Sequence, residues 1–187
     1  MATELMGFEI TSAWLIWMLP FAAALIMPGI GKLSQNATKY VAVGFALMSA
    51  VSAASLVPLA LEAGEVHSQI MWIEALGIKA GVLADPLSII MANVVAWISF
   101  LIMIYSTGYM KGDKDITRFW FWMMFFIGSM QLIILSDNLL QVFFGWEGVG
   151  LASYALISFW YRDKKKDHVG QEGRSVLGVM EYFSPTH

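Results

Sequence analysis

The sequence predicts an all-α integral membrane protein with five transmembrane helices. Hydrophobic residues make up 58% of its 187 residues, charged residues make up only 13%, and the mean hydropathy is +0.67. A soluble domain carries about 25% charged residues, so this chain has too little polar surface to cover a water-facing particle. Five apolar runs are long enough to cross about 30 Å of hydrocarbon. Helices are expected, because a chain in lipid must satisfy its backbone internally and nothing alternates like a series of barrel strands.

Each predicted span is an apolar run with charged or turn residues at its ends. The first is not a signal peptide, because Glu4 and Glu9 precede it in place of Lys or Arg, and because the run is too long. The fourth is the shortest, but Phe119-Trp120-Phe121-Trp122 at its start makes it strongly apolar. The five spans are residues 13–30, 37–61, 87–109, 119–135 and 139–161.

The basic residues predict an orientation. All but one of the eleven Lys and Arg residues lie on one side of the predicted membrane, and only Lys79 lies on the other. The positive-inside rule then places the N-terminus outside and the C-terminus in the cytoplasm of a multi-pass cell-membrane protein. The residues on the cytoplasmic side are Lys32, Lys39, Lys111, Lys114, Arg118, Arg162, Lys164, Lys165, Lys166 and Arg174.

The two longest polar segments lie at residues 62–86 and 162–187. The first is predicted to be an outer loop with a weak hairpin of β-leaning runs at 69–74 and 78–83. Asp85-Pro86 reads as the cap and first residue of the third span. The second is predicted to be a cytoplasmic tail of a single membrane domain. Its final Ser184-Pro185 is a helix start without a helix, so we expect a truncation point there and the front part of a longer protein.

The strongest sign of function is an acidic residue inside a predicted span. Glu147 lies near the middle of the fifth span, among Gly145, Gly148 and Gly150. A carboxylate at that depth costs about 2.5–3.5 kcal/mol on insertion scales, and such residues usually face a protein interior and mark an ion path. The glycines would let another backbone approach closely. We predict a proton-translocating role for Glu147, and the alternative is a carboxylate that only holds two helices together.

Weaker polar positions could continue a path from Glu147. Asn93 in the third span and Gln131 in the fourth lie at a similar depth by residue count. Tyr154 and Ser158 follow Glu147 by seven and eleven positions, so they share its helical face. These four residues form a possible polar path. For Asn93 and Gln131, hydrogen bonding between helices is an equally good interpretation.

Several kinds of site and partner are not expected. The chain has no cysteine for an iron–sulfur cluster, and its three histidines all lie outside the predicted spans, so no pair of them could hold a haem between helices. The net charge of −3 offers no basic footprint for nucleic acid. We therefore expect no cofactor or metal site in this chain, and the lipid bilayer as its surroundings.

Four segments of the sequence resemble one family of membrane subunits. They are Asp85-Pro86-Leu87-Ser88, Tyr105-Ser106-Thr107-Gly108-Tyr109-Met110, Ser136-Asp137-Asn138-Leu139 and Gly145-Trp146-Glu147-Gly148-Val149-Gly150-Leu151-Ala152-Ser153-Tyr154. Together they resemble the large antiporter-like subunit of respiratory complex I, called subunit L or, in mitochondria, chain 5. The resemblance covers nearly the whole chain and is strongest over residues 85–161. Its details are similar to the L subunit of the archaeal coenzyme F420H2 dehydrogenase.

The resemblance implies a proton-translocating subunit of an oxidoreductase complex, with no redox site of its own. Quinone or methanophenazine, flavin and iron–sulfur clusters would then belong to partner subunits, and the other membrane subunits would be its partners. Glu147 would be the acidic member of a glutamate–lysine pair, whose lysine lies beyond position 187. Family members are about three times longer, so the 187 residues alone are expected not to pump.

Two alternatives remain at this stage. The same motif occurs in the large subunits of cation/proton antiporters and membrane-bound hydrogenases. A structural five-helix membrane protein, in which Glu147 only contributes to packing, is the alternative from another functional class. Substitution of Glu147 by Gln distinguishes this last possibility, because a packing role tolerates the amide and a proton carrier does not.

Overall fold

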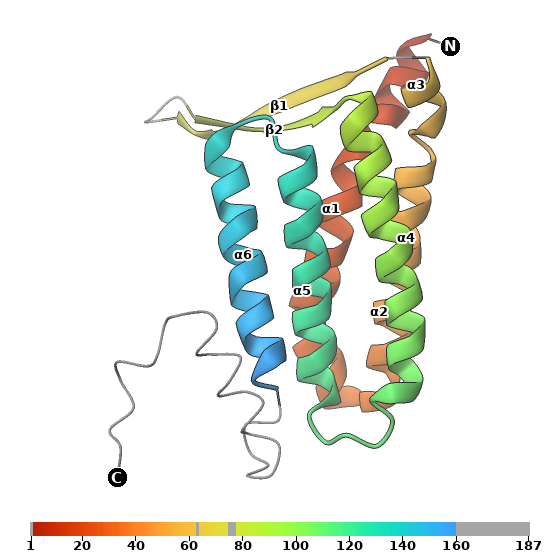
Figure 1. Ribbon diagram of the computed structural model, residues 1–187, viewed down its shortest axis with the longest axis vertical. Coiled ribbons are helices and arrows are strands. Elements are labelled where there is room, and N and C mark those ends of the chain that lie inside the picture. The colour runs from red at the N-terminus through yellow and green to blue at the C-terminus, as the bar shows by residue number, and fades with distance from the viewer. Residues whose placement is uncertain (1, 63, 75–77, 160–187) are drawn as a thin grey trace.

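The computed structural model describes residues 2–62, 64–74 and 78–159. Within them, long helices run side by side and a two-stranded hairpin lies across one end of the bundle, the end at which the N-terminus also lies (Figure 1). The elements are α1 (Ala2–Leu33), α2 (Gln35–Ala54), α3 (Val57–Leu61), β1 (Val66–Ile73), β2 (Ile78–Ala84), α4 (Pro86–Tyr109), α5 (Ile116–Leu135) and α6 (Leu139–Ile157). Five helical segments of this part of the chain are long and apolar enough to cross a membrane.

The largest differences from the predicted spans lie in the first, second and fifth of them. Helix α1 begins well before residue 13, because the polar residues that precede the apolar run continue the same helix. The predicted span 37–61 is divided into α2 and the short α3; Pro58, which has no N–H to donate, lies at the start of α3. Helix α6 ends at Ile157, and the last two residues of the predicted span 139–161 lie outside the described residues, as does the tail at 162–187.

The N-termini of α4 and α6 are closed by side chains. Asp85 Oδ1 accepts a hydrogen bond from the Ser88 N–H at 2.7 Å, and Ser88 Oγ accepts one from the Asp85 N–H at 2.9 Å, with Pro86 in the first turn. This capping box confirms the start predicted from Asp85-Pro86. At α6, Asn138 Oδ1 accepts from the Gln141 N–H at 2.9 Å. Both caps lie at the hairpin end of the bundle.

The helices meet around two buried clusters. Helix α1 packs against α2 and α5, α4 packs against α2 and α5, and the main helical neighbour of α6 is α5. The cluster near the hairpin is rich in alanine, which allows close approach of helix backbones. The other cluster, toward the opposite end, contains larger side chains such as Met27, Met103 and Trp120. At that opposite end, the chain turns from α4 to α5 through Gly112, whose φ of 88° is in the left-handed region that favours glycine.

The hairpin is part of the packed structure. Strands β1 and β2 pair antiparallel from Val66 opposite Ala84 to Ile73 opposite Ile78, with an irregularity between Met71 and Ile73. Both strands extend further toward the bundle than the predicted runs 69–74 and 78–83. The reason is that their inner ends are buried: Val82 and Ala84 are fully enclosed by the alanine-rich cluster.

Candidate proton-translocating site

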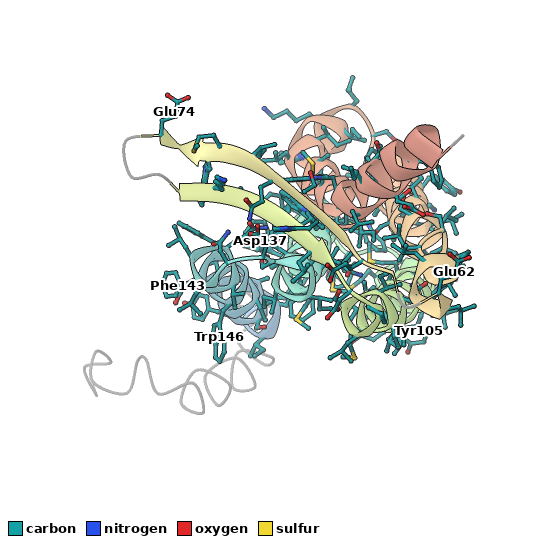
Figure 2. The ribbon with its side chains drawn as sticks, turned by 90° about the horizontal axis from the view of Figure 1, so that it is seen from above. Glu62, Glu74, Tyr105, Asp137, Phe143 and Trp146 are labelled. Atoms are coloured by element: carbon teal, nitrogen blue, oxygen red, sulfur yellow. The ribbon has the colours of Figure 1, made fainter. Side chains whose placement is uncertain are left out.

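Glu147 lies in the middle of α6, on a face that no described element covers. The opposite face of the helix carries Gly145, Gly148 and Ala152, which are buried against α5. A Cβ at Gly145 would come within 3.1 Å of the backbone oxygen of Ser129, so the two backbones are nearly in contact. Because three small residues turn toward α5, the large neighbours of Glu147 turn outward. Figure 2 shows Phe143 and Trp146 pointing away from the bundle.

The exposed face of α6 combines apolar side chains with one carboxylate. Trp146 is 69% exposed, Leu151 53% and Tyr154 38%, and Glu147 is exposed between them. Within the described part of the chain, no hydrogen bond or ion pair involves the Glu147 carboxylate. A charge on such a face cannot stay against lipid without a cost of several kcal/mol. A polar or charged group from another segment would lower this cost.

Asn93 and Gln131 belong to a different part of the bundle. Asn93 Nδ2 on α4 donates to the Ala53 carbonyl of α2 at 2.8 Å, and Gln131 Nε2 on α5 donates to the Ala92 carbonyl of α4 at 3.0 Å. Ser49 Oγ on α2 likewise donates to the Ile16 carbonyl of α1 at 2.6 Å. These bonds, each from a side chain to a backbone carbonyl, connect α5 to α4, α4 to α2 and α2 to α1. Among the described residues the Gln131 Oε1 atom is buried without a hydrogen-bond partner.

Tyr154 and Ser158 lie on α6 below Glu147, toward the end away from the hairpin. Tyr154 is partly exposed on the same face as Glu147. Ser158 is the C-cap residue of α6, and its hydroxyl donates to the Tyr154 carbonyl at 2.8 Å. The polar positions expected to form one path thus divide into two groups, one on the outer face of α6 and one among α2, α4 and α5.

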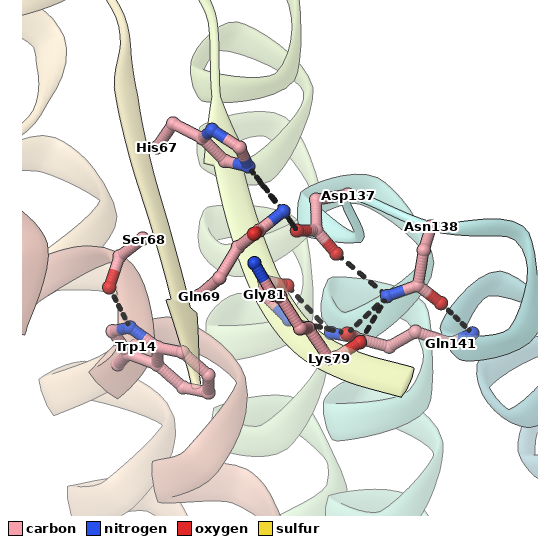
Figure 3. A network of polar contacts seen from close by, with 9 residues as sticks. All are labelled: Trp14, His67, Ser68, Gln69, Lys79, Gly81, Asp137, Asn138 and Gln141. Carbon is pink, nitrogen blue, oxygen red and sulfur yellow. Dashed lines mark hydrogen bonds and ion pairs between the residues drawn. The ribbon is translucent and has the colours of Figure 1, made fainter. Parts of the chain in front are cut away.

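A polar network joins the hairpin to the turn between α5 and α6 (Figure 3). The Asp137 carboxylate, whose side chain is only 3% exposed, accepts from Gln69 Nε2 at 2.7 Å and lies 3.3 Å from His67 Nε2. Asn138 Nδ2 donates to the Lys79 carbonyl at 2.9 Å. This network could not be predicted from the sequence. Ser136-Asp137-Asn138 is a polar turn between two apolar spans and part of a segment that resembles the family, and neither feature indicates what the turn contacts.

Gln141 and Gly81 form the most buried contact of this network. Gln141 Oε1 accepts from the Gly81 N–H, and Gln141 Nε2 donates to the Gly81 carbonyl, each at 3.0 Å. Gly81 has no room for a side chain, because a Cβ there would overlap the Asp137 carboxylate. The hairpin therefore holds the first turn of α6 through a side-chain amide that binds one strand residue at both its backbone groups.

Two carboxyl groups at this end of the bundle have lowered pKa values. Burial raises the pKa of Asp137, but hydrogen bonds from Gln69, Asn138 and His67 and the attraction of His67 outweigh burial, so the net pKa lies below the ordinary 3.8. Hydrogen bonds from the side chain and backbone of Ser88 lower the pKa of Asp85 in the same direction. Both groups are ionised at neutral pH and stabilise the fold in that form.

Acid should weaken this end of the bundle. Since the folded-state pKa of Asp137 is below the unfolded value, its contribution is complete above about pH 3.8 and is lost as the pH falls through the folded-state pKa. We expect Asp137→Asn to lower the midpoint of thermal unfolding at neutral pH and to reduce its further fall in acid. The measurement is unfolding in detergent from about pH 6 to about pH 3. Glu65→Gln, at an exposed carboxyl beside the hairpin, should behave as the parent; an Asn variant with the parent's full acid sensitivity would contradict the assignment.

No metal site emerges from the described residues. Residues 2–62, 64–74 and 78–159 contain no group of three or more His, Cys, Asp or Glu side chains placed to hold an ion.

Comparison with known proteins relates the chain to one family. Residues 71–120 match the family model described as NADH-ubiquinone oxidoreductase (complex I), chain 5 N-terminus, and residues 136–172 match the NADH:quinone oxidoreductase/Mrp antiporter transmembrane model. NADH-quinone oxidoreductase subunit L of Escherichia coli is 35% identical over 82% of this chain and 26% of its own length. Subunit L of Rickettsia conorii is 38% identical over 79% of this chain and 23% of its own length. The chain belongs to the complex I chain 5-type family of antiporter-like membrane subunits, and its match lies in the family's N-terminal region.

The chain 5-type region spans about a quarter of the length of the curated relatives that it matches. Together with its five apolar helices, this relationship makes it a multi-pass membrane protein. Its fold is similar to that of chains in two solved assemblies. The Mrp complex from Dietzia sp. DQ12-45-1b gives a TM-score of 0.64 at 24% identity, over 78% of this chain and 16% of that one. The archaeal membrane-bound sulfane sulfur reductase gives 0.71 at 15% identity, over 89% and 34%. These homologues and structural neighbours are subunits of multi-subunit membrane complexes.

Proposed function

We propose that this chain supplies a proton-carrying carboxylate, Glu147, to a proton-translocating subunit of a complex I-like oxidoreductase. The observation that carries the proposal is the position of Glu147: halfway along a membrane helix, on the face that no described element covers. The residue lies within the segment matched to the NADH:quinone oxidoreductase/Mrp antiporter model. Removing a carboxylate from water costs free energy, and ionisable residues inside a membrane are usually functional. Exchange of a proton with a neighbouring group is a function that would explain the position of Glu147.

The charge state of Glu147 would be set by the segment that covers α6. A cation within about 4–6 Å favours the ionised carboxylate, and withdrawal of that cation favours protonation. A lysine on an adjacent helix fits this requirement. Tyr154 and Ser158 could continue hydrogen bonding along the same face, and Asn93 and the free Oε1 of Gln131 could hold water among α2, α4 and α5. The path between the two groups is part of this proposal.

We further propose that the hairpin end faces outward and the opposite end faces the cytoplasm. The ends of the helices support this orientation, since Lys32, Lys111 and Lys114 are exposed at the end away from the hairpin. Cysteines introduced at Glu65 and Lys111 should react with a membrane-impermeant maleimide from opposite sides of intact cells. Labelling of the Lys111 position from outside, without permeabilisation, would reverse the orientation.

The assembly is proposed to be of the NADH-quinone or F420H2 dehydrogenase type. In such a complex, flavin and iron–sulfur clusters reside in partner subunits, which reduce quinone or methanophenazine. The alternatives are the large subunit of a cation/proton antiporter, favoured by the fold similarity to the Mrp complex, and a membrane-bound hydrogenase. Affinity purification from native membranes in mild detergent distinguishes them. Flavin and iron–sulfur absorbance that co-purifies and responds to NADH or F420H2 supports the dehydrogenase. Iron–sulfur absorbance that responds to hydrogen and to neither of these donors supports the hydrogenase, and a colourless assembly supports the antiporter.

A further inference from the structure

We propose that Gln141 is a positioning residue, which holds α6 at a fixed rotation and depth through its contact with Gly81 and thereby positions Glu147. This inference rests on the proposed function of Glu147, but its geometric part can be tested separately. It assigns the hairpin a role: a support that determines where the carboxylate of α6 lies.

Helix α6 presents only small residues to α5, so a second support for its position is useful. The residues that it turns toward α5 are Gly145, Gly148 and Ala152. Such small residues allow close approach, but they offer no side chain that interlocks with the neighbour. In this region α5 presents the side chains and the backbone of Ser129 and Ile133 to these glycines. The side chains at this contact therefore come from α5 alone, and a contact with an element other than α5 adds a second restraint on rotation and sliding of α6.

The Gln141 amide provides that restraint. Its oxygen and nitrogen bind the N–H and the carbonyl of the same residue, Gly81, at 3.0 Å each, and the residue is only 4% exposed. Two hydrogen bonds to the same residue determine both the direction in which the Gln141 side chain points and its position along the axis of α6. Because Gly81 is itself buried, breaking the contact would leave its two backbone groups without partners.

Strand β2 is a suitable anchor because it is held on several sides. Val82 and Ala84 are buried in the core shared by α1, α2 and α4. Its partner strand is bonded to α1, where Trp14 Nε1 donates to Ser68 Oγ at 3.2 Å (Figure 3). The main bundle thus fixes the position of Gly81. Because Gln141 is bonded to Gly81, it fixes the position of α6 relative to the main bundle.

Gln141 and Glu147 are close enough on one helix for this to matter. Their six-residue separation corresponds to about 9 Å along the axis. A carboxylate lies about 6 Å from the helix axis, so a rotation of about 20° would move it by about 2 Å. That displacement is a large part of the roughly 4–6 Å over which a neighbouring charge controls the protonation of a carboxyl group.

The test compares Gln141→Met with Ser49→Ala, because each substitution removes a buried hydrogen bond between two elements and Ser49 lies on α2, away from α6. Spin labels are attached to cysteines introduced at two exposed positions, Leu33 of α1 and Ile157 of α6, and the distance between the labels is measured. The 187 residues contain no other cysteine. In nanodiscs, Gln141→Met should shift or broaden the distance distribution of the labels by about 2 Å. In the assembled complex it should change the rate of carbodiimide modification of Glu147 by about threefold or more, as expected for the loss of a net hydrogen bond. Ser49→Ala should leave both unchanged.

The outcomes separate the two proposals. An unchanged distance, or a changed distance with an unchanged modification rate at Glu147, overturns the positioning role of Gln141. If both change but Glu147→Gln still supports normal proton translocation, the positioning role stands and the proposed function fails. Should Gln141→Met not fold, Gln141→Glu, which still accepts from the Gly81 N–H, is measured in its place. If the spin-label distance and the modification rate of Glu147 in that variant both equal those of the parent protein, the proposal is overturned.

Discussion

Glu147→Gln should abolish most proton translocation while leaving the protein folded and assembled. The amide keeps the size of the side chain and its ability to hydrogen bond, but it removes the group that exchanges a proton. Positioned acid–base groups commonly accelerate proton transfer by about a hundredfold or more, so a loss of that order is expected through this subunit. Because Glu147 is exposed on α6 in the described part of the chain, the substitution should not disturb packing against α5.

The measurement is proton uptake into vesicles per electron transferred, with assembly checked on a native gel. Glu147→Asp should retain part of the activity, since its carboxylate remains but is one methylene shorter. Glu62→Gln, at an exposed carboxyl in the connection before the hairpin, is the matched control and should pump as the parent does. A parental proton-to-electron ratio for Glu147→Gln would show that the carboxylate serves packing only.

Gly145→Ala should destabilise the protein although it adds a single methyl group. The new Cβ would lie 2.6 Å from Ile133 Cγ1, 3.1 Å from the Ser129 carbonyl oxygen and 3.2 Å from the Ile133 nitrogen. Two of these three atoms belong to the α5 backbone and cannot rotate away. The helices must therefore separate, and overpacking of this kind costs about 1–3 kcal/mol.

Gly150→Ala on the same helix is the matched control. No atom lies within 4 Å of a Cβ built at Gly150, so alanine should be tolerated, and its higher helix propensity is worth up to about 1 kcal/mol. The comparison is made by unfolding the purified protein in mixed micelles with increasing dodecyl sulfate. Equal effects of the two substitutions would mean that α5 and α6 are not in the close contact described.

The local sequence determined where the helices lie, where α4 begins and how far along its helix the carboxylate lies. Apolar run length alone sufficed for five spans, because crossing a bilayer is a requirement on total hydrophobicity and length. Asp85-Pro86 predicted the start of α4, because capping is a contact between residues three positions apart. The depth of Glu147 follows from counting along α6. None of these features depends on a neighbouring element.

The orientation of each helix around its axis came only from tertiary packing. A membrane helix is apolar on all sides, so its sequence lacks the polar face that would indicate which residues turn inward. That Glu147 faces away from α5, and that Gln131 donates to the Ala92 carbonyl, follow from which helix lies beside which. The contact of Gln141 with Gly81 joins residues 60 positions apart through a glycine backbone, and hydrophobicity patterns carry no information on such a pairing.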